Sequence, residues 1–122
     1  MKNIHVKRVY EPVDPKDGAR VLVDRVWPRG MTKERLHAHW WLKEVAPSTA
    51  LRKWFNHDPE KWHEFKRRYC TELRTKSNFV AKLLDMANQK TLTLLYSAKD
   101  TECNQAVALA EYLLSQMKKP DS

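Results

Sequence analysis

The chain has 122 residues, and its 23 basic and 15 acidic side chains give a formal net charge of +8. With 42% apolar residues, among them five tryptophans, it can pack one domain, which excludes an intrinsically disordered protein. No apolar run approaches the roughly 20 residues of a transmembrane helix, and no secretory signal is recognised. We therefore expect a cytoplasmic protein with no membrane partner.

The excess of positive charge lies in the first two thirds of the sequence. A surplus of this size favours anionic partners, such as phosphate groups or nucleic acid, through its long-range field. The alternative is that the charge serves solubility, which small domains gain from a net charge of either sign.

The first half of the chain predicts short strands that alternate with loops. Residues 4–10 carry a partly alternating apolar pattern, and residues 21–23 are a continuous apolar run, which is typical of a strand buried on both faces. Between them, residues 11–18 combine two prolines with an Asp-Gly pair and predict a turn-rich loop. Residues 37–46 predict a third strand or extended segment, because Pro47 restricts the residue before it to extended conformations.

The remaining segments predict helices and one more strand. Apolar side chains recur at helical spacing along residues 62–73 and 79–87, and residues 91–96 predict a second buried strand. The expected helix N-caps are Thr32, Ser48, Asp58, Ser77, and either Asp100 or Thr101.

Strands separated by helices predict an α/β fold: a small, mainly parallel sheet covered by helices, a Rossmann-like sandwich that forms a single domain over residues 1–122. Ligands of such sheets bind at the carboxyl ends of the strands. Two loops leave the buried strands there, residues 24–30 and 97–104. We therefore expect Asp24 and Asp100 to lie on the same edge of the sheet and to frame the site.

The first of these loops reads Asp-Arg-Val-Trp-Pro-Arg-Gly. Arg25 and Arg29 could hold a phosphate or carboxylate through their fork-shaped guanidinium groups, and Trp27 could stack on a base. In the alternative interpretation, the arginines form internal ion pairs with Asp24 or Glu72 and Trp27 closes the end of the sheet. For the binding interpretation, at least one arginine must face a cleft shared with the second loop.

The second loop opens a helix, so its backbone N–H groups, with Ser97, Lys99 and Thr101, could hold an anion. Alternatively, Asp100 caps the helix and takes the place that an anion would occupy. Cys103 lies where a thiolate is stabilised, but the arginine that a phosphatase-type loop needs six residues later is a leucine here, which favours an inert thiol.

No metal ion and no cofactor is expected. The five histidines have no acidic or cysteine partner at a spacing typical of metal sites, and the glycine-rich P-loop of triphosphate-binding proteins is absent. Residues 52–58 mix basic and aromatic side chains, as single-strand binding surfaces do, and the basic residues 66–68 extend this pattern. Trp54 and Phe55, however, share a helical face with Leu51, which favours a place in the core.

Several stretches, above all Asp-Arg-Val-Trp-Pro-Arg-Gly at 24–30 and Thr-Leu-Thr-Leu-Leu-Tyr-Ser-Ala-Lys-Asp at 91–100, resemble the YeaO-like branch of the uncharacterised bacterial family called domain of unknown function 488. The resemblance covers nearly the whole chain and implies a compact α/β fold and an intracellular bacterial protein, but no reaction. Members of this branch often have a histidine where Gln105 stands, and glutamine cannot act as a general base. The pocket residues that the resemblance implies are Asp24, Arg25, Trp27, Arg29, Lys43, Ser48, Arg52, Tyr69, Glu72, Ser97, Lys99, Asp100 and Asn104.

Three functions are compatible with these residues. The first is binding of a phosphate-bearing ligand, a nucleic acid or a nucleotide, at the carboxyl ends of the strands. The second is a small hydrolase or transferase in the same cleft, with Asp24 or Glu72 as acid or base and Arg25 and Arg29 holding an anionic substrate. The third is a basic interaction module that docks an acidic protein, which predicts a broad basic surface without a cavity.

Overall fold

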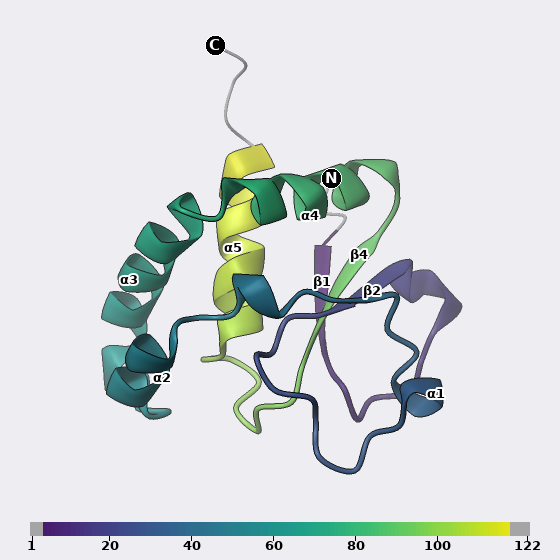
Figure 1. Ribbon diagram of the computed structural model, residues 1–122, viewed down its shortest axis with the longest axis horizontal. Coiled ribbons are helices and arrows are strands. Elements are labelled where there is room, and N and C mark those ends of the chain that lie inside the picture. The colour runs from purple at the N-terminus through teal and green to yellow at the C-terminus, as the bar shows by residue number, and fades with distance from the viewer. Residues whose placement is uncertain (1–3, 118–122) are drawn as a thin grey trace.

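The computed structural model describes residues 4–117, and the statements below refer to that part of the chain (Figure 1). One sheet of four parallel strands has the order β1-β4-β2-β3, so the predicted parallel α/β fold is confirmed. The strands are β1 (Ile4–Arg8), β2 (Ala19–Leu22), β3 (Trp40–Trp41) and β4 (Leu92–Tyr96). The α-helices are α1 (Lys33–Leu36), α2 (Thr49–Phe55), α3 (Trp62–Arg74), α4 (Ser77–Gln89) and α5 (Gln105–Met117), and short 3-10 helices cover Pro15–Asp17, Lys43–Val45 and Pro59–Lys61.

The two strands that precede the predicted loops are neighbours in the sheet. In the parallel register, Val21 of β2 lies beside Leu94 of β4, and Leu22 lies beside Leu95. Both strands therefore end at the same edge, which confirms that the segments after them meet there. None of the helices within residues 4–117 is long and apolar enough to cross a membrane.

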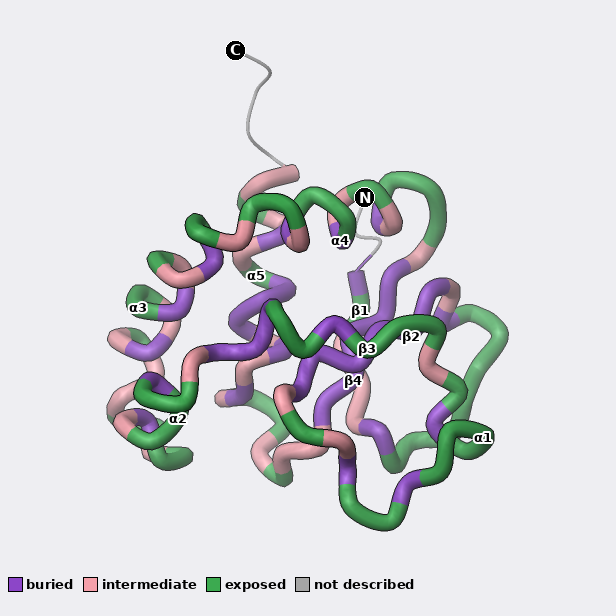
Figure 2. Tube along the Cα trace, viewed as in Figure 1, coloured by how far each residue is buried: buried purple, intermediate pink, exposed green. Residues whose placement is uncertain are grey.

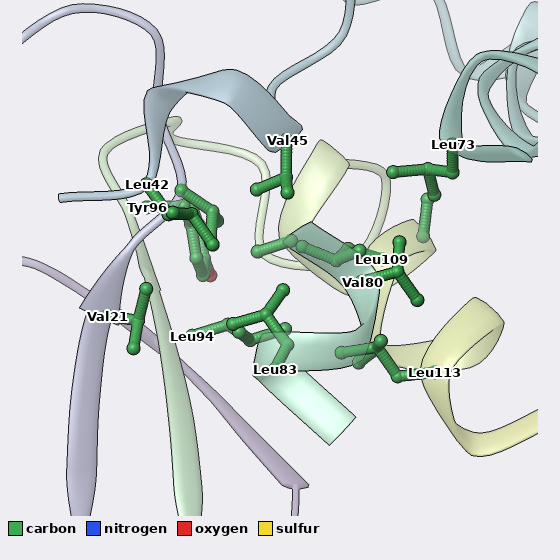
Figure 3. Close-up of a cluster of buried hydrophobic side chains, with 14 of the residues drawn as sticks. Val21, Leu42, Val45, Leu73, Val80, Leu83, Leu94, Tyr96, Leu109 and Leu113 are labelled. Atoms are coloured by element: carbon green, nitrogen blue, oxygen red, sulfur yellow. The ribbon is translucent and has the colours of Figure 1, made fainter. Parts of the chain in front are cut away.

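The main core lies between one face of the sheet and helices α2 to α5 (Figures 1 and 3). Because side chains alternate along a strand, Val21 and Leu94 point to this face, where they meet Leu83, Leu109 and Leu113 from the helices. All five side chains are completely buried. Burial of a leucine or valine stabilises a fold by about 1.5–3 kcal/mol, so this layer holds the helices on the sheet.

The opposite face is covered by much less structure. Leu22 and Leu95 point to it and form a small second cluster with Val9, Met31 and Leu36, over which lie the single turn of α1 and its flanking loops (Figure 1). The sequence predicted strands buried under helices on both faces. The described α-helices other than α1 instead lie on one side, and the remainder of the second face carries polar groups.

A buried ion cluster occupies that remainder. Arg20 is 1% exposed, and its Nη1 lies 2.5 Å from a carboxylate oxygen of Asp17. Its other nitrogens donate to the carbonyls of Leu36 (2.8 Å) and His37 (3.2 Å), while Nζ of Lys7 lies 3.0 Å from the same carboxylate. Burial opposes ionisation of Asp17, but hydrogen bonds from Lys7, a backbone N–H and Arg20 outweigh it and hold the pKa of Asp17 below its usual value.

Three of the predicted helix caps are confirmed. The side chains of Thr32, Ser48 and Asp58 each accept a backbone hydrogen bond, Asp58 at the 3-10 turn that leads into α3. Ser77 is not a cap, because α4 begins with this residue and Lys76 occupies the cap position without a side-chain hydrogen bond. The start of α5 also differs and is described with the site.

We expect a buried ion pair to contribute more to the free energy of unfolding than an exposed ion pair of the same length. Asp17→Asn leaves the Arg20 charge buried without its counterion and should lower the free energy of unfolding by about 3–5 kcal/mol. In the matched control, Glu64→Gln breaks an exposed pair with Arg67, also at 2.5 Å and also three residues apart, and should have a far smaller effect. Urea denaturation followed by circular dichroism measures both, and similar small losses would contradict a structural role for the buried cluster.

Candidate functional site

A cavity of about 840 Å³ opens where β2 and β4 end. Its walls come from the segments after these strands, from α2 with the residues that follow it, and from the start of α5. This volume is within the range of small-molecule binding sites. Of the predicted residues, the cavity is lined by Asp24, Arg25, Arg52, Ser97, Lys99, Asp100 and Asn104.

Glu72 and Ser48 lie together outside the cavity. The Ser48 hydroxyl donates to one carboxylate oxygen of Glu72 at 2.6 Å, and the Ser48 backbone N–H donates to the other at 2.8 Å. The same hydroxyl oxygen accepts from the backbone N–H of Leu51 and so caps α2. Glu72 therefore anchors the start of α2 to α3, and it does not face the cleft in which we expected it to act as an acid or base.

The other predicted residues that do not line the cavity are Trp27, Arg29, Lys43 and Tyr69. The Trp27 indole N–H donates to a backbone carbonyl at 2.6 Å, and the ring packs edge-on against Trp41. Tyr69 is buried and donates to a backbone carbonyl in the core. Arg29 is exposed, and Lys43 lies over the ring of Trp41.

Asp24 forms a link between three segments in the cavity wall. Its carboxylate accepts from the backbone N–H of Ser97 at 2.9 Å, from the Ser97 hydroxyl at 2.7 Å and from the side-chain amide of Gln105. Asp24 is 7% exposed, and this burial raises the pKa of its carboxyl group, although the bonds from Ser97, the charge of Arg52 and the bond from Gln105 oppose the rise. The carboxylate thus joins the ends of β2 and β4 to the first residue of α5.

Four cationic side chains from three segments line the cavity. Arg25 follows β2, Arg52 and Lys53 belong to α2, and Lys99 follows β4. Nε and Nη2 of Arg25 lie 3.4 and 3.1 Å from the carbonyl oxygen of Pro47, so the guanidinium group is fixed between two walls. The convergence of these cations makes the cavity suitable for an anion.

The ion pairs of residues 4–117 do not include Arg25 or Arg29. The alternative interpretation, in which both arginines are locked by Asp24 or Glu72, is therefore wrong for the described structure. Arg25, and not Arg29, lines the same cavity as Lys99.

The segment after β4 contains one more turn than predicted before α5 begins. A carboxylate oxygen of Asp100 accepts from the backbone N–H groups of Cys103 (2.9 Å) and Glu102 (2.8 Å), and these bonds lower the pKa of Asp100. The cap of α5 is Asn104, whose side-chain oxygen accepts from the backbone N–H of Val107 at 3.0 Å. The prediction that Asp100 or Thr101 caps the last helix is therefore wrong.

The surroundings of Cys103 disfavour a thiolate. Burial raises its pKa, and the nearby carboxylates of Asp100 and Glu102 raise it further. Within residues 4–117, no group of histidine, cysteine and carboxylate side chains could hold a metal ion.

Several cavity residues were not predicted as site residues from the sequence, among them Lys53, Asn56 and His57. Asn56 and His57 follow α2 with φ angles of 46° and 55°, a left-handed conformation that non-glycine residues seldom adopt. This conformation ends the helix and turns the chain along the cavity wall. The asparagine was the available signal, because it is the residue that most readily replaces glycine at such a helix end.

Fold and site together define a small parallel α/β protein with a basic cavity at the carboxyl ends of its central strands. Residues 3–122 match a family model described as "Inactive DUF488-N3 subclade", and the chain belongs to this family. It is 46% identical over 113 residues to "Uncharacterized protein YeaO" of Escherichia coli K12, an alignment that covers 93% of this chain and 98% of that protein.

Two mycobacterial relatives are similar at a somewhat lower level. "Uncharacterized protein Rv3073c" of Mycobacterium tuberculosis and "Uncharacterized protein Mb3100c" of Mycobacterium bovis are each 41% identical over 110 residues, which cover 90% of this chain and 92% of theirs. No solved structure matches the chain. The predicted membership of the YeaO-like branch of the family is confirmed.

Removal of the Asp24 carboxylate should loosen the three segments that it joins. Asp24→Ala leaves the N–H of Ser97 and the amide of Gln105 without their acceptor and should lower the free energy of unfolding by about 2–3 kcal/mol. Asp24→Asn should cost less, because its amide oxygen still accepts from Ser97 and a reversed Gln105 amide can accept from its NH₂ group. Equal losses in urea denaturation would contradict the linking role.

The raised pKa of Asp24 also predicts that the difference in stability between Asp24→Asn and the natural protein depends on pH. Because the native pKa exceeds the unfolded value of about 3.9, the carboxyl stabilises the fold fully below that pH and loses this contribution as the pH rises through the native pKa. The stability of Asp24→Asn relative to the natural protein should therefore increase as the pH rises from about 4. If the two proteins differ in free energy of unfolding by the same amount at pH 4 and at pH 8, the raised pKa of Asp24 is contradicted.

Proposed function

We propose that the protein binds a phosphate-bearing ligand of the nucleotide type in the cavity at the carboxyl ends of β2 and β4. The convergence of Arg25, Arg52, Lys53 and Lys99 from three separate segments carries this proposal. Two carboxylates also line the cavity, but Asp24 and Asp100 are both hydrogen-bonded to neighbouring protein groups. The anion that enters therefore meets a surplus of positive charge.

The rest of the cavity wall suits the uncharged part of such a ligand. Phe55 and Phe65 stack with their ring centroids 4.4 Å apart, and both line the cavity together with Pro47 and Val26. Apolar walls with a few convergent polar groups are the usual composition of small-molecule sites. A nucleoside phosphate has the matching division into an anionic end and a flat, mostly apolar end.

The hydrolase or transferase alternative receives less support from this geometry. Glu72 is bound to Ser48 outside the cavity, and three donors already occupy the Asp24 carboxylate. Gln105, the third member of that link, has no group that exchanges a proton near neutral pH. The description of the family as inactive agrees with a binding role. The third function, a basic module that docks an acidic protein, is also less favoured, because it predicts a surface without a cavity and the structure has one.

We further infer that the protein works in the bacterial cytoplasm. Cys70 and Cys103 are both free thiols, as is usual in a reducing compartment. Nucleotides are abundant there as potential ligands.

Arg25 and Arg29 provide a matched test of the binding site. Arg25→Lys should weaken adenosine monophosphate about tenfold, or about 1.4 kcal/mol, because one ammonium group must then serve both the Pro47 carbonyl and the phosphate. Arg29→Lys, in the same loop but outside the cavity, should leave the affinity unchanged. Isothermal titration calorimetry at low salt measures the affinities, and thermal melts report the fold.

Two results would overturn the proposed function. The first is the absence of any binding of adenosine monophosphate or inorganic phosphate by the natural protein at low salt. The second is an Arg25→Lys protein with a strongly reduced melting temperature and an unchanged affinity, which would make Arg25 a structural residue only.

A further inference from the structure

Asp100 brings a carboxylate with one unused oxygen into the wall of the cavity. Its Oδ1 accepts from the backbone N–H groups of Glu102 (2.8 Å) and Cys103 (2.9 Å), and these two bonds fix the side chain. Within residues 4–117, no hydrogen bond or ion pair uses Oδ2 of Asp100. Residues 97–103 are exposed or half-buried, so a ligand can approach this oxygen (Figure 2).

The other carboxylate of the cavity, that of Asp24, has little capacity left for a ligand. Asp24 is 7% exposed, and its two oxygens already accept from the N–H and hydroxyl of Ser97 and from the amide of Gln105. An ionised carboxylate has about four acceptor positions, two on each oxygen. Asp100, and not Asp24, is therefore the carboxylate that a bound ligand can use.

An open carboxylate is unexpected in a cavity that collects cations for an anionic ligand. The N–H groups of Cys103 and Glu102, and the charge of His57 in the same wall, lower the pKa of Asp100 and favour its ionised form. His57 forms no hydrogen bond or ion pair with it in the described part of the chain. The negative charge therefore opposes binding of an anion unless Oδ2 meets a hydrogen-bond donor of the ligand.

The position of Asp100 beside a cation indicates which donor this is. A nucleotide carries hydroxyl groups on its sugar and, in several cases, an amino group on its base. Lys99 precedes Asp100 directly and lines the same cavity, so a cation for the phosphate lies next to the open carboxylate. In a nucleoside monophosphate the sugar lies between the phosphate and the base, and its hydroxyls are the donors nearer to the phosphate. The apolar wall around Phe55 and Phe65 is left for the base.

We propose that the ligand of the cavity is a ribonucleotide and that Oδ2 of Asp100 accepts hydrogen bonds from its ribose hydroxyls. This inference rests on the proposed function, to which it adds the chemistry of the sugar. Dinucleotide-binding α/β folds likewise place a carboxylate against a ribose hydroxyl at the carboxyl ends of their strands. Here the carboxylate follows β4 and is held by its own loop.

The test on the natural protein compares three nucleotides by calorimetry at low salt. Adenosine monophosphate should bind at least about tenfold more tightly than dideoxyadenosine monophosphate, which has the same base and phosphate but lacks both ribose hydroxyls. Inosine monophosphate keeps the ribose and lacks the amino group of the base, and its affinity should equal that of adenosine monophosphate.

Asp100→Ser and Glu102→Ser form a matched pair of variants. Each replaces an acidic residue of the same loop by serine, but Glu102 is exposed and does not line the cavity. The serine at position 100 still offers an oxygen to the backbone N–H groups, and it has no second oxygen for the ribose. Asp100→Ser should therefore bring the affinity ratio of the ribo- to the dideoxynucleotide to about one and should bind inorganic phosphate no more weakly than the natural protein. Glu102→Ser should keep the natural ratio.

The possible failures are distinguishable. If adenosine monophosphate binds but the hydroxyls add no affinity, or if Asp100→Ser keeps the natural ratio, the ribose inference is overturned and the proposed function stands. If loss of the base amino group weakens binding and loss of the hydroxyls does not, the ribose inference is again overturned. If neither adenosine monophosphate nor inorganic phosphate binds, both are overturned. An Asp100→Ser protein that melts at a lower temperature and loses all three ligands alike makes Asp100 a residue that only shapes the loop, which overturns the ribose inference alone.

Discussion

The buried carboxylate of Asp24 is the interaction on which the site depends. The last backbone hydrogen bond between β2 and β4 runs from the N–H of Val23 to the carbonyl of Leu95, at 3.1 Å. Beyond that point the Asp24 side chain takes over, because its carboxylate accepts the next N–H of the neighbouring segment, that of Ser97. On the other side, the Asp24 carbonyl accepts from the indole of Trp41. One residue thus ties the diverging ends of three strands and keeps the cavity open between them.

Charge serves two different purposes in two parts of the molecule. On the second face of the sheet, Lys7 and Arg20 are both bound to Asp17, so these cations stabilise a face that has only a one-turn helix above it. Beyond the carboxyl ends of the strands, Arg52 and Lys99 line the cavity and take part in none of the ion pairs found in residues 4–117. Positive charge that the fold neutralises is structural, and positive charge that it leaves open is available to a ligand.

The architecture and the edge that carries the site could be predicted from the sequence because both follow from short-range patterns. Two apolar runs defined the central strands, and parallel pairing then placed Asp24 and Asp100 at one edge. Ser48 and Glu72 could not be separated from the site in this way. A serine that caps a helix and a glutamate that binds it look like pocket residues until their distance of 2.6 Å is known.

The start of α5 shows a second reason why a prediction from the sequence can be wrong. The segment after β4 offers three residues with capping side chains, Asp100, Thr101 and Asn104, and local preference does not rank them. The choice of Asn104 agrees with a long-range contact, because the helix then begins at Gln105, whose side-chain amide donates to Asp24. The left-handed conformation of Asn56 is a local feature by contrast, because its N–H donates to the carbonyl of Arg52 at the end of α2.

The short edge strand β3 limits pairing with other chains. A long, apolar edge would pair with other chains, but β3 has two residues and pairs with β2 through those alone. Lys43 and Lys82 also place a positive charge over the exposed rings of Trp41 and Trp40, which discourages contact with a second basic molecule.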